Sequence, residues 1–245
     1  MAIEPWRTAK VVKIIDETFN TRRFFFQVPE LEQFDFKPGQ FVTLDLPIHE
    51  KKNKRWRSYS IASWPDGTNT FELVIVLLEG GAGTNYLFNE VKEGDELIFR
   101  GPQGVFTLPE TLEEDYYFIC TGTGIAPFRS MLHEIATKNI PRKDVYLIFG
   151  TRTKDTLLYF DELTELAKNY PGIHYIPVLS REQWEGEHGY VHKVYRHIIK
   201  EKKKDGELPP SHFYLCGWRN MIDEAKKVIT ELGFDRKSIH QELYG

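Results

Sequence analysis

The sequence has few cysteines, no long apolar run and little net charge, and each of these absences excludes a class of protein. Cys120 and Cys216 are the only cysteines in 245 residues, too few for a disulfide framework or for the four ligands of an iron–sulfur cluster. This usage favours a reducing compartment, so we expect a cytoplasmic protein. No apolar run approaches the length of a membrane span, and the first residues lack the pattern of a secretory signal.

Nucleic-acid binding and metal binding are also disfavoured. A net charge of −4 gives no electrostatic reason to expect a nucleic-acid partner. His188, His192 and His197 lie close together, but Gly189 stands between the first two near a predicted helix start. We therefore expect solvated histidines and no metal site. The length allows one large domain or two ordinary ones.

Residues 1–110 are predicted to form an antiparallel β domain, either a β-barrel or a sandwich. Short strands alternate with turns such as Lys37-Pro38-Gly39 and Pro65-Asp66-Gly67, at a spacing typical of barrels and sandwiches. Phe25 interrupts the alternation of the second strand. One helix is expected near residues 84–91. The predicted strands cover residues 10–15, 22–28, 41–46, 57–63 and 71–78.

Residues 111–245 have a different rhythm, in which strands alternate with helices. This order indicates βαβ units and a parallel sheet, so the second domain is predicted to be α/β. The boundary is expected in the acidic stretch at residues 108–114. The predicted strands cover residues 116–120, 145–149, 173–179 and 213–216, and the predicted helices cover residues 128–136, 156–168, 191–200 and 221–232.

The stretch Arg57-Ser58-Tyr59-Ser60 combines three groups that suit a flavin nucleotide. Arg57 offers a planar set of donors for a phosphate. Tyr59, which points away from Ser58 on a strand, offers a flat ring for stacking, and Ser60 is a small donor. An ordinary strand with a surface arginine and a half-buried tyrosine would have the same four residues.

A second stretch, Thr121 to Pro127, follows the first strand of the α/β region. Gly122 and Gly124 let a backbone approach a pyrophosphate closely, and the following helix directs free N–H groups at the anion. Pro127 suits a first helical turn, where its missing donor costs nothing. Because Pro127 stands where a third glycine would be, this is not the G-x-G-x-x-G fingerprint. The stretch predicts a nucleotide site.

Arginines follow the next two strands of the predicted sheet. Arg152 comes after Phe149-Gly150-Thr151, and Arg181 comes after Ser180. Arginines at this edge would pair with a 2′-phosphate, which favours NADP(H) over NAD(H). Surface pairing with Asp155 or Glu182 is the alternative, and it is most open for Arg152.

Seven motifs in this order resemble the ferredoxin–NADP reductase family over nearly the whole chain. Besides the two stretches above and Ser180-Arg181, these are Gly80 to Leu87, Gly101-Pro102-Gln103-Gly104-Val105-Phe106, Cys216-Gly217 with Met221, and Glu242-Leu243-Tyr244. The sequence departs from the family pattern where Gly245 follows Tyr244. It also lacks the second basic residue that often follows the Ser-Arg pair.

The resemblance implies FAD and NADP(H) as cofactors and assigns the residues that hold them. Those expected to bind a cofactor are Arg57, Ser58, Tyr59, Ser60, Ile75, Gly81, Ala82, Gly83, Thr84, Thr121, Gly122, Thr123, Gly124, Ile125, Ala126, Pro127, Arg152, Ser180, Arg181, Cys216, Gly217, Met221 and Tyr244. Those expected to be catalytic are Ser60, Cys216, Glu242 and Tyr244.

The resemblance also implies the reaction. Hydride would pass between nicotinamide C4 and flavin N5, with Ser60, Cys216 and Glu242 close to the reacting atoms and Tyr244 stacked on the flavin. Single electrons would pass to or from ferredoxin or flavodoxin. Lys51 to Arg55 would suit such an acidic carrier, and a merely solvated loop is the alternative for this segment. The protein is expected to be a monomer or a weak dimer. A free-flavin reductase, an electron-transfer subunit of a larger enzyme and a regulatory module without turnover remain alternatives.

Overall fold

A computed structural model describes the backbone of residues 4–244, and the side chain of Tyr244 lies outside the described part. The chain divides into two compact units. The first contains residues 1–108 together with residues 129–134, and the second contains residues 109–128 and 135–245. None of the helices in the described range has the length and apolar character needed to span a bilayer.

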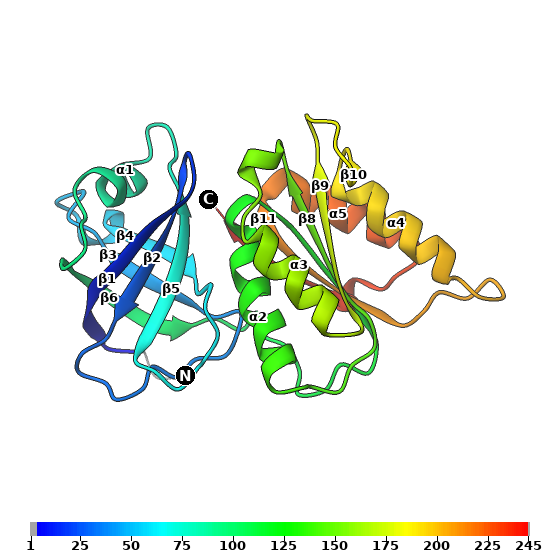
Figure 1. The fold of residues 1–245 in the computed structure, drawn as a ribbon, viewed down its shortest axis with the longest axis horizontal. Coiled ribbons are helices and arrows are strands. Elements are labelled where there is room, and N and C mark those ends of the chain that lie inside the picture. Colours follow the sequence, from blue (N-terminus) through cyan, green and yellow to red (C-terminus); the bar gives the residue numbers. More distant parts are fainter. Residues whose placement is uncertain (1–3, 245) are drawn as a thin grey trace. The chain divides into compact units, whose positions relative to one another are not determined.

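The described part of the first unit contains a six-stranded antiparallel sheet in the order β4-β3-β6-β1-β2-β5 (Figure 1). The backbone N–H of Ala62, just after β4, donates to the carbonyl of Glu72 on β5, which brings the two ends of the sheet together as a barrel. The elements are β1 (Trp6–Thr18), β2 (Thr21–Gln27), β3 (Phe41–Asp45), η1 (Lys52–Lys54), β4 (Trp56–Ser60), β5 (Thr70–Val76), α1 (Ala82–Asn89) and β6 (Glu96–Gln103).

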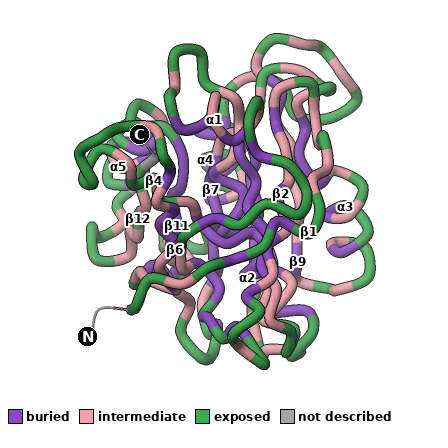
Figure 2. The backbone as a smooth tube through the Cα atoms, turned by 90° about the vertical axis from the view of Figure 1, so that its left-hand side faces the viewer, coloured by how far each residue is buried: buried purple, intermediate pink, exposed green. Residues whose placement is uncertain are grey.

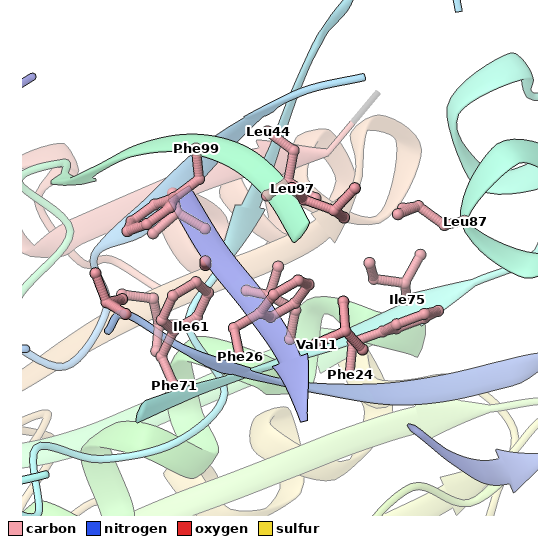
Figure 3. Packing of buried hydrophobic residues seen from close by; sticks show 14 of the residues in the cluster. Val11, Phe24, Phe26, Leu44, Ile61, Phe71, Ile75, Leu87, Leu97 and Phe99 are labelled. Carbon is pink, nitrogen blue, oxygen red and sulfur yellow. The ribbon is translucent and has the colours of Figure 1, made fainter. Parts of the chain in front are cut away.

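The core of the first unit is made by inward side chains of alternate strand residues (Figure 3). Phe24 and Phe26 are fully buried there, whereas Phe25 lies on the outer face under the cations of Lys13 and Arg23. The interruption that Phe25 makes in the sequence pattern is therefore an outward aromatic residue and not a break in the strand. Strand β6 was not predicted, because its Gly101-Pro102 pair indicates a turn when the sequence is considered alone.

The described part of the second unit contains a six-stranded sheet in the order β10-β9-β8-β7-β11-β12, and all of its pairings are parallel. Its elements are β7 (Asp115–Thr121), η2 (Gly122–Ile125), α2 (Ala126–Thr137), β8 (Val145–Thr151), η3 (Lys154–Thr156), α3 (Phe160–Asn169), β9 (Ile173–Leu179), β10 (Glu187–His188), α4 (Val191–Lys202), β11 (Ser211–Trp218), α5 (Arg219–Glu231), η4 (Arg236–Ser238) and β12 (Ile239–Tyr244).

Helices cover both faces of the parallel sheet, as expected for strands that read as continuous apolar runs (Figures 1 and 2). Helices α4 and α5 pack on the face that carries Ile119, Ile148 and Leu215. On the opposite face Phe128 stacks on Phe118, with ring centroids 4.9 Å apart. Both faces of the sheet are therefore buried. Ligands can reach it at the carboxyl ends of its strands.

Two local predictions are corrected by the structure. The helix expected at residues 156–168 begins at Phe160, because residues 154–156 form a separate 3-10 turn and Tyr159 adopts a left-handed conformation. His192 is not solvated. It is 6% exposed, and its ring lies 3.0 Å from the Tyr195 hydroxyl and 3.3 Å from Glu224.

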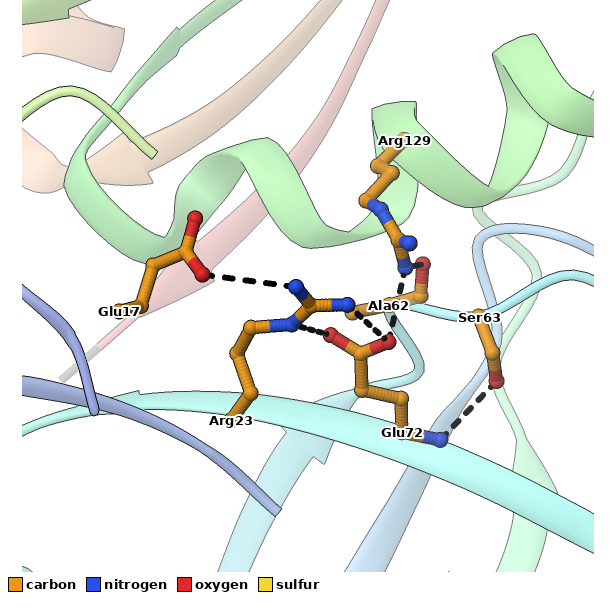
Figure 4. Close-up of polar contacts among 6 residues, drawn as sticks. All are labelled: Glu17, Arg23, Ala62, Ser63, Glu72 and Arg129. Atoms are coloured by element: carbon orange, nitrogen blue, oxygen red, sulfur yellow. Dashed lines mark hydrogen bonds and ion pairs between the residues drawn. The ribbon is translucent and has the colours of Figure 1, made fainter. Parts of the chain in front are cut away.

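A buried cluster of charged residues lies where the first unit's sheet closes (Figure 4). Glu72, 2% exposed, accepts from Arg23 Nε at 2.6 Å and from Arg129 Nη1 at 3.0 Å. Arg129, 3% exposed, also donates to the carbonyl of Ala62 at 2.9 Å. The cluster therefore joins β2, β5 and the segment after β4.

Removing the Glu72 carboxylate should destabilise the first unit strongly, because Arg23 and Arg129 would both lose a buried carboxylate partner. We expect Glu72→Gln to lower the free energy of unfolding by about 3–5 kcal/mol. Denaturant titration of the FAD-loaded protein, followed by the release of flavin fluorescence, measures this change.

The control is Glu165→Gln, which removes an exposed carboxylate 3.4 Å from Lys168. Such a surface pair contributes little, so the unfolding midpoint should stay at the wild-type value. A Glu72→Gln midpoint as high as that of the control would show that the cluster does not hold the sheet closed.

Candidate functional site

In the first unit, the candidate site is built where β4 passes the start of α1. Arg57 pairs with Leu44 and Tyr59 with Val42 across β3, so both point to the side of the core residues. Ser58 points the other way, and its hydroxyl lies 2.9 Å from that of Thr43. Ser60 is 4% exposed at the end of the strand. The strand therefore separates Arg57 and Tyr59 from Ser58, as its pleat requires.

Arg57 lies directly against the start of α1. A Cβ at Gly83 would stand 3.0 Å from Arg57 Cγ and 3.2 Å from Arg57 Nε, so the close approach depends on the missing side chain. Arg57 Nη1 donates to the carbonyls of Lys54 and Trp56 at 3.1 and 2.8 Å, which orients the guanidinium. The helix start adds backbone N–H groups that have no acceptor within the helix.

Two side chains fix the loop that leads into this helix. The Thr84 hydroxyl bonds with the backbone of Leu78 and Gly81, and the Asn85 amide donates to the same two carbonyls. Gly80, at φ +70°, has open space where a Cβ would stand. A cation beside fixed backbone donors fits the pyrophosphate of a flavin dinucleotide.

Tyr59 is partly buried against the core of the first unit. Burial raises the pKa of its hydroxyl to about 12, while the nearby Arg57 guanidinium acts in the opposite direction. The ring is therefore neutral at physiological pH, which suits stacking on a flat ligand. Ile75, 1% exposed, packs with its side chain in the core.

In the second unit, the candidate site lies at the carboxyl ends of β7 and β11. Cys216 stands opposite Cys120 on one neighbouring strand and opposite Glu242 on the other. Both thiols are fully buried, and burial with the adjacent Cys216 raises the pKa of the Cys120 thiol. Glu242 is half-buried. The structure thus aligns two of the predicted catalytic residues across neighbouring strands.

Glycines let the loop after β7 meet the end of β11. A Cβ at Gly124 would stand 2.4 Å from the carbonyl oxygen of Cys216. A Cβ at Gly217, which adopts φ +146°, would stand 2.6 Å from Thr121 Oγ1 and 3.1 Å from Met221 Cε. Residues that sequence motifs assign to one site therefore pack together, and no side chain could be added between them without displacement.

Two features of the loop after β7 suit a bound nucleotide: a hydroxyl without a partner among the described residues and a glycine beside open space. The Thr121 hydroxyl oxygen is buried and has no hydrogen-bond partner among the described residues. Gly122, at φ +54°, has open space on the side where a Cβ would stand. Thr123, Ile125, Ala126 and Pro127 complete a 3-10 turn and the first turn of α2. An unpartnered hydroxyl and an open glycine fit a bound pyrophosphate or amide.

Arg152 and Arg181 are exposed at the ends of β8 and β9. Asp155 accepts instead from the Thr153 hydroxyl and Glu182 from the backbone N–H of Lys154. Among residues 4–244 neither arginine has an ion-pair partner, so the surface pairing considered from the sequence is absent. Ser180 is held by bonds from its N–H and hydroxyl to the carbonyl of Thr151.

An open pocket of about 540 Å³ is lined by Thr153, Lys154, Asp155 and Glu182, which follow the two arginines in the sequence. Tyr190, 68% exposed, stands at the start of α4, and the preceding Gly189 N–H bonds to the carbonyl of Leu179. Sequence reasoning does not single out Tyr190, although an aromatic residue after a glycine at a predicted helix start is a visible signal. No cluster of metal-ligating side chains occurs in the described part of the chain.

Comparison with known proteins agrees with the two sites. Residues 8–108 match the oxidoreductase FAD-binding domain, and residues 118–227 match the oxidoreductase NAD-binding domain. The chain is 34% identical to ferredoxin–NADP reductase B of Sorangium cellulosum over 98% of each chain. It is also 34% identical to the anthranilate 1,2-dioxygenase electron transfer component of Acinetobacter baylyi, with 87% of this chain matching 60% of that protein.

A solved ferredoxin NADP+ reductase from Neisseria gonorrhoeae with bound FAD and NADP has a similar fold. Its TM-score is 0.79 at 25% identity, over 97% of this chain and 98% of that one. Fold and matching domains define a two-domain oxidoreductase that uses FAD and a nicotinamide nucleotide. Within that class, the chain belongs to the ferredoxin–NADP reductase family.

Loss of the Arg57 guanidinium should weaken FAD retention. A charge-assisted hydrogen bond contributes about 1.5–3 kcal/mol, so Arg57→Ala should raise the dissociation constant for FAD about tenfold or more. Fluorescence titration of the apoprotein with FAD measures this constant.

Arg55→Ala is the matched control, because Arg55 is paired with Asp45 at 2.7 Å and not with α1. It should keep the wild-type FAD affinity. Equal affinities in the Arg57→Ala variant and the control would mean that Arg57 does not contact the pyrophosphate.

Proposed function

We propose that this protein is an NADPH-oxidising reductase that delivers electrons to a ferredoxin or flavodoxin. The observation that carries the proposal is the charge at the second site: Arg152 and Arg181 have no counter-ion among the described residues, at the edge where the 2′-phosphate of NADP(H) would lie. The similarity to a ferredoxin–NADP reductase supports the same direction. The domains are proposed as residues 1–110 for FAD and 111–245 for NADP(H).

The bound cofactors supply the hydride and electron chemistry, and the protein's residues supply binding and alignment. Arg57 and the start of α1 hold the flavin pyrophosphate, and Tyr59 stacks on the ring. Thr121 to Pro127 hold the nicotinamide nucleotide, and Tyr190 offers an exposed ring to its adenine. Ser60 would lie near the flavin ring, and Cys216 and Glu242, opposite each other on β11 and β12, would lie near the nicotinamide.

A second function has specific support from the comparisons. Several relatives are named as reductase or electron-transfer components, such as the glycine betaine monooxygenase reductase subunit of Pseudomonas aeruginosa. This chain spans about three fifths of the length of those relatives. The alternative is therefore that the protein supplies electrons to an oxygenase through a separate carrier. A free-flavin reductase is the remaining enzymatic alternative.

Steady-state oxidation of NADPH and NADH with ferricyanide as acceptor tests the proposed function. We expect Arg181→Ala to lower kcat/KM for NADPH at least about tenfold and to spare NADH, because a charged contact to the 2′-phosphate is lost. Arg152→Ala should also lower kcat/KM for NADPH, but by a smaller factor, because the sequence assigns Arg152 less firmly to the 2′-phosphate than Arg181.

Arg236→Ala is the control, because it removes an exposed arginine from η4. It should leave both nucleotides unaffected. Equal losses with NADPH and NADH would show that Arg181 does not contact the 2′-phosphate. A wild-type protein that oxidises neither nucleotide would contradict the proposed function as a whole.

The terminal strand β12 ends at Tyr244, whose ring is expected to cover the flavin. Tyr244 stands opposite Trp218 in the parallel pairing with β11, while its side chain and Gly245 lie outside the described residues. If the ring covers the flavin, it competes with nicotinamide. Tyr244→Ser should then bind NADP+ more tightly, strengthen the nicotinamide–flavin charge-transfer band and slow turnover through product release.

Titration of NADP+ into the FAD-loaded protein, with the flavin spectrum recorded, measures this effect. Tyr244→Phe is the control and should behave as wild type, because it keeps the flat ring. Identical spectra and dissociation constants in wild type and Tyr244→Ser would show that the ring does not cover the flavin.

A further inference from the structure

Two exposed tryptophans enclose an arginine on the outer face of the first unit's sheet. Arg100 on β6 pairs with Trp6 on β1, and its guanidinium carbon lies 4.8 Å from the Trp6 ring and 5.4 Å from the Trp56 ring. The two indole centroids are 5.6 Å apart. We call Trp6, Trp56 and Arg100 the tryptophan face.

The charge of Arg100 has no carboxylate partner in the described part of the chain. Its Nε atom is buried and lacks a hydrogen-bond acceptor. Asp45 lies on the same side of the sheet, beside Trp56 in the register, but it is engaged by Arg55 at 2.7 Å. The indole rings therefore fix a guanidinium whose Nε hydrogen bond is not made to any described residue.

The surroundings of the tryptophan face are strongly basic. Residues 51–57 contain no acidic side chain and three lysines, besides Arg55, which pairs with Asp45, and Arg57, which points to the other side of β4, in a chain whose net charge is −4. Lys51, Lys52 and Lys54 are exposed, and Trp56 lies within this segment. A surface of this charge attracts an acidic partner and repels a basic one.

The residues of the tryptophan face are of the types that bind partner proteins, and their role is not limited to stabilising the sheet. Trp6 and Trp56 remain 38% and 37% exposed, and tryptophan and arginine are the residues most enriched among those that dominate protein–protein affinity. Exposed cation–π contacts contribute little to stability. Stability of the sheet alone therefore gives a weak reason for two exposed indoles around an unpaired guanidinium.

We propose that the tryptophan face, with the basic segment beside it, is the docking surface for the acidic electron-carrier protein. This inference rests on the proposed function, since it names where the carrier binds. Trp56 is three strand residues from Tyr59, a separation of about 10 Å along β4. Tyr59 points to the other side of β4, so this strand alone would separate a carrier seated on the face from the residue proposed to stack on the flavin.

The test uses the FAD-loaded enzyme and an acidic [2Fe–2S] ferredoxin as the probe. Calorimetric titration gives the dissociation constant, and NADPH-driven ferredoxin reduction gives KM. Arg100→Gln should raise both constants about tenfold or more, and Trp6→Leu should act in the same direction. Arg100→Lys should recover only part of the affinity, because an ammonium group lacks the planar set of donors. The wild-type affinity should fall with added salt, and this dependence should be weaker in Arg100→Gln.

Ferricyanide reduction and FAD content should stay at wild-type values in these variants, and Arg236→Gln, which removes a charge elsewhere, should keep wild-type ferredoxin binding. Unchanged ferredoxin constants in Arg100→Gln, or equal losses with ferredoxin and ferricyanide, would overturn the inference. So would a wild-type enzyme that reduces ferricyanide with NADPH but does not bind the ferredoxin. Failure to oxidise NADPH with ferricyanide would instead contradict the proposed function.

Discussion

The closing of the antiparallel sheet at Ala62 and Glu72 is the constraint on which the first site depends. The N–H of Ala62 bonds to the Glu72 carbonyl, while the Glu72 carboxylate and the Ala62 carbonyl both engage Arg129. Ala62 follows β4 directly, so this junction fixes the position of the strand that carries Arg57 and Tyr59. A buried charge cluster is costly unless every charge is matched, which makes the junction specific as well as strong.

Both candidate sites use missing side chains in the same way. Gly83 admits Arg57 to the start of α1, and Gly124 and Gly217 admit the loop after β7 to the end of β11. In each case the nearest atoms to an added Cβ belong to another predicted site residue. The fold therefore brings the backbone segments of each candidate site close together, and this close packing matters more than any single reactive group. That suits a protein whose cofactors carry the reaction and whose own task is alignment.

The sequence was sufficient for the features that depend on local order. Turn residues and apolar periodicity predicted most strands, and motif order predicted which loops meet. It was insufficient where partners are distant. Glu72 looks like a polar residue in a strand until Arg129, 57 positions away, is placed beside it. Likewise nothing local relates Trp6 to Arg100. Strand β6 escaped prediction because glycine and proline have turn preferences that the sheet overrides here.

The nucleotide site and the proposed docking surface share one feature of charge: neighbouring carboxylates are engaged by other groups, and Arg100, Arg152 and Arg181 have no carboxylate partner among the described residues. At the second site Asp155 and Glu182 are bound to a hydroxyl and a backbone N–H, so Arg152 and Arg181 keep their charge for a phosphate. On the first unit Arg55 engages Asp45, so Arg100 keeps its charge for a partner. In a chain of net charge −4, such fixed local cations favour the approach of an anion at these positions. Selectivity thus follows from where carboxylates are neutralised, and not from the number of basic residues.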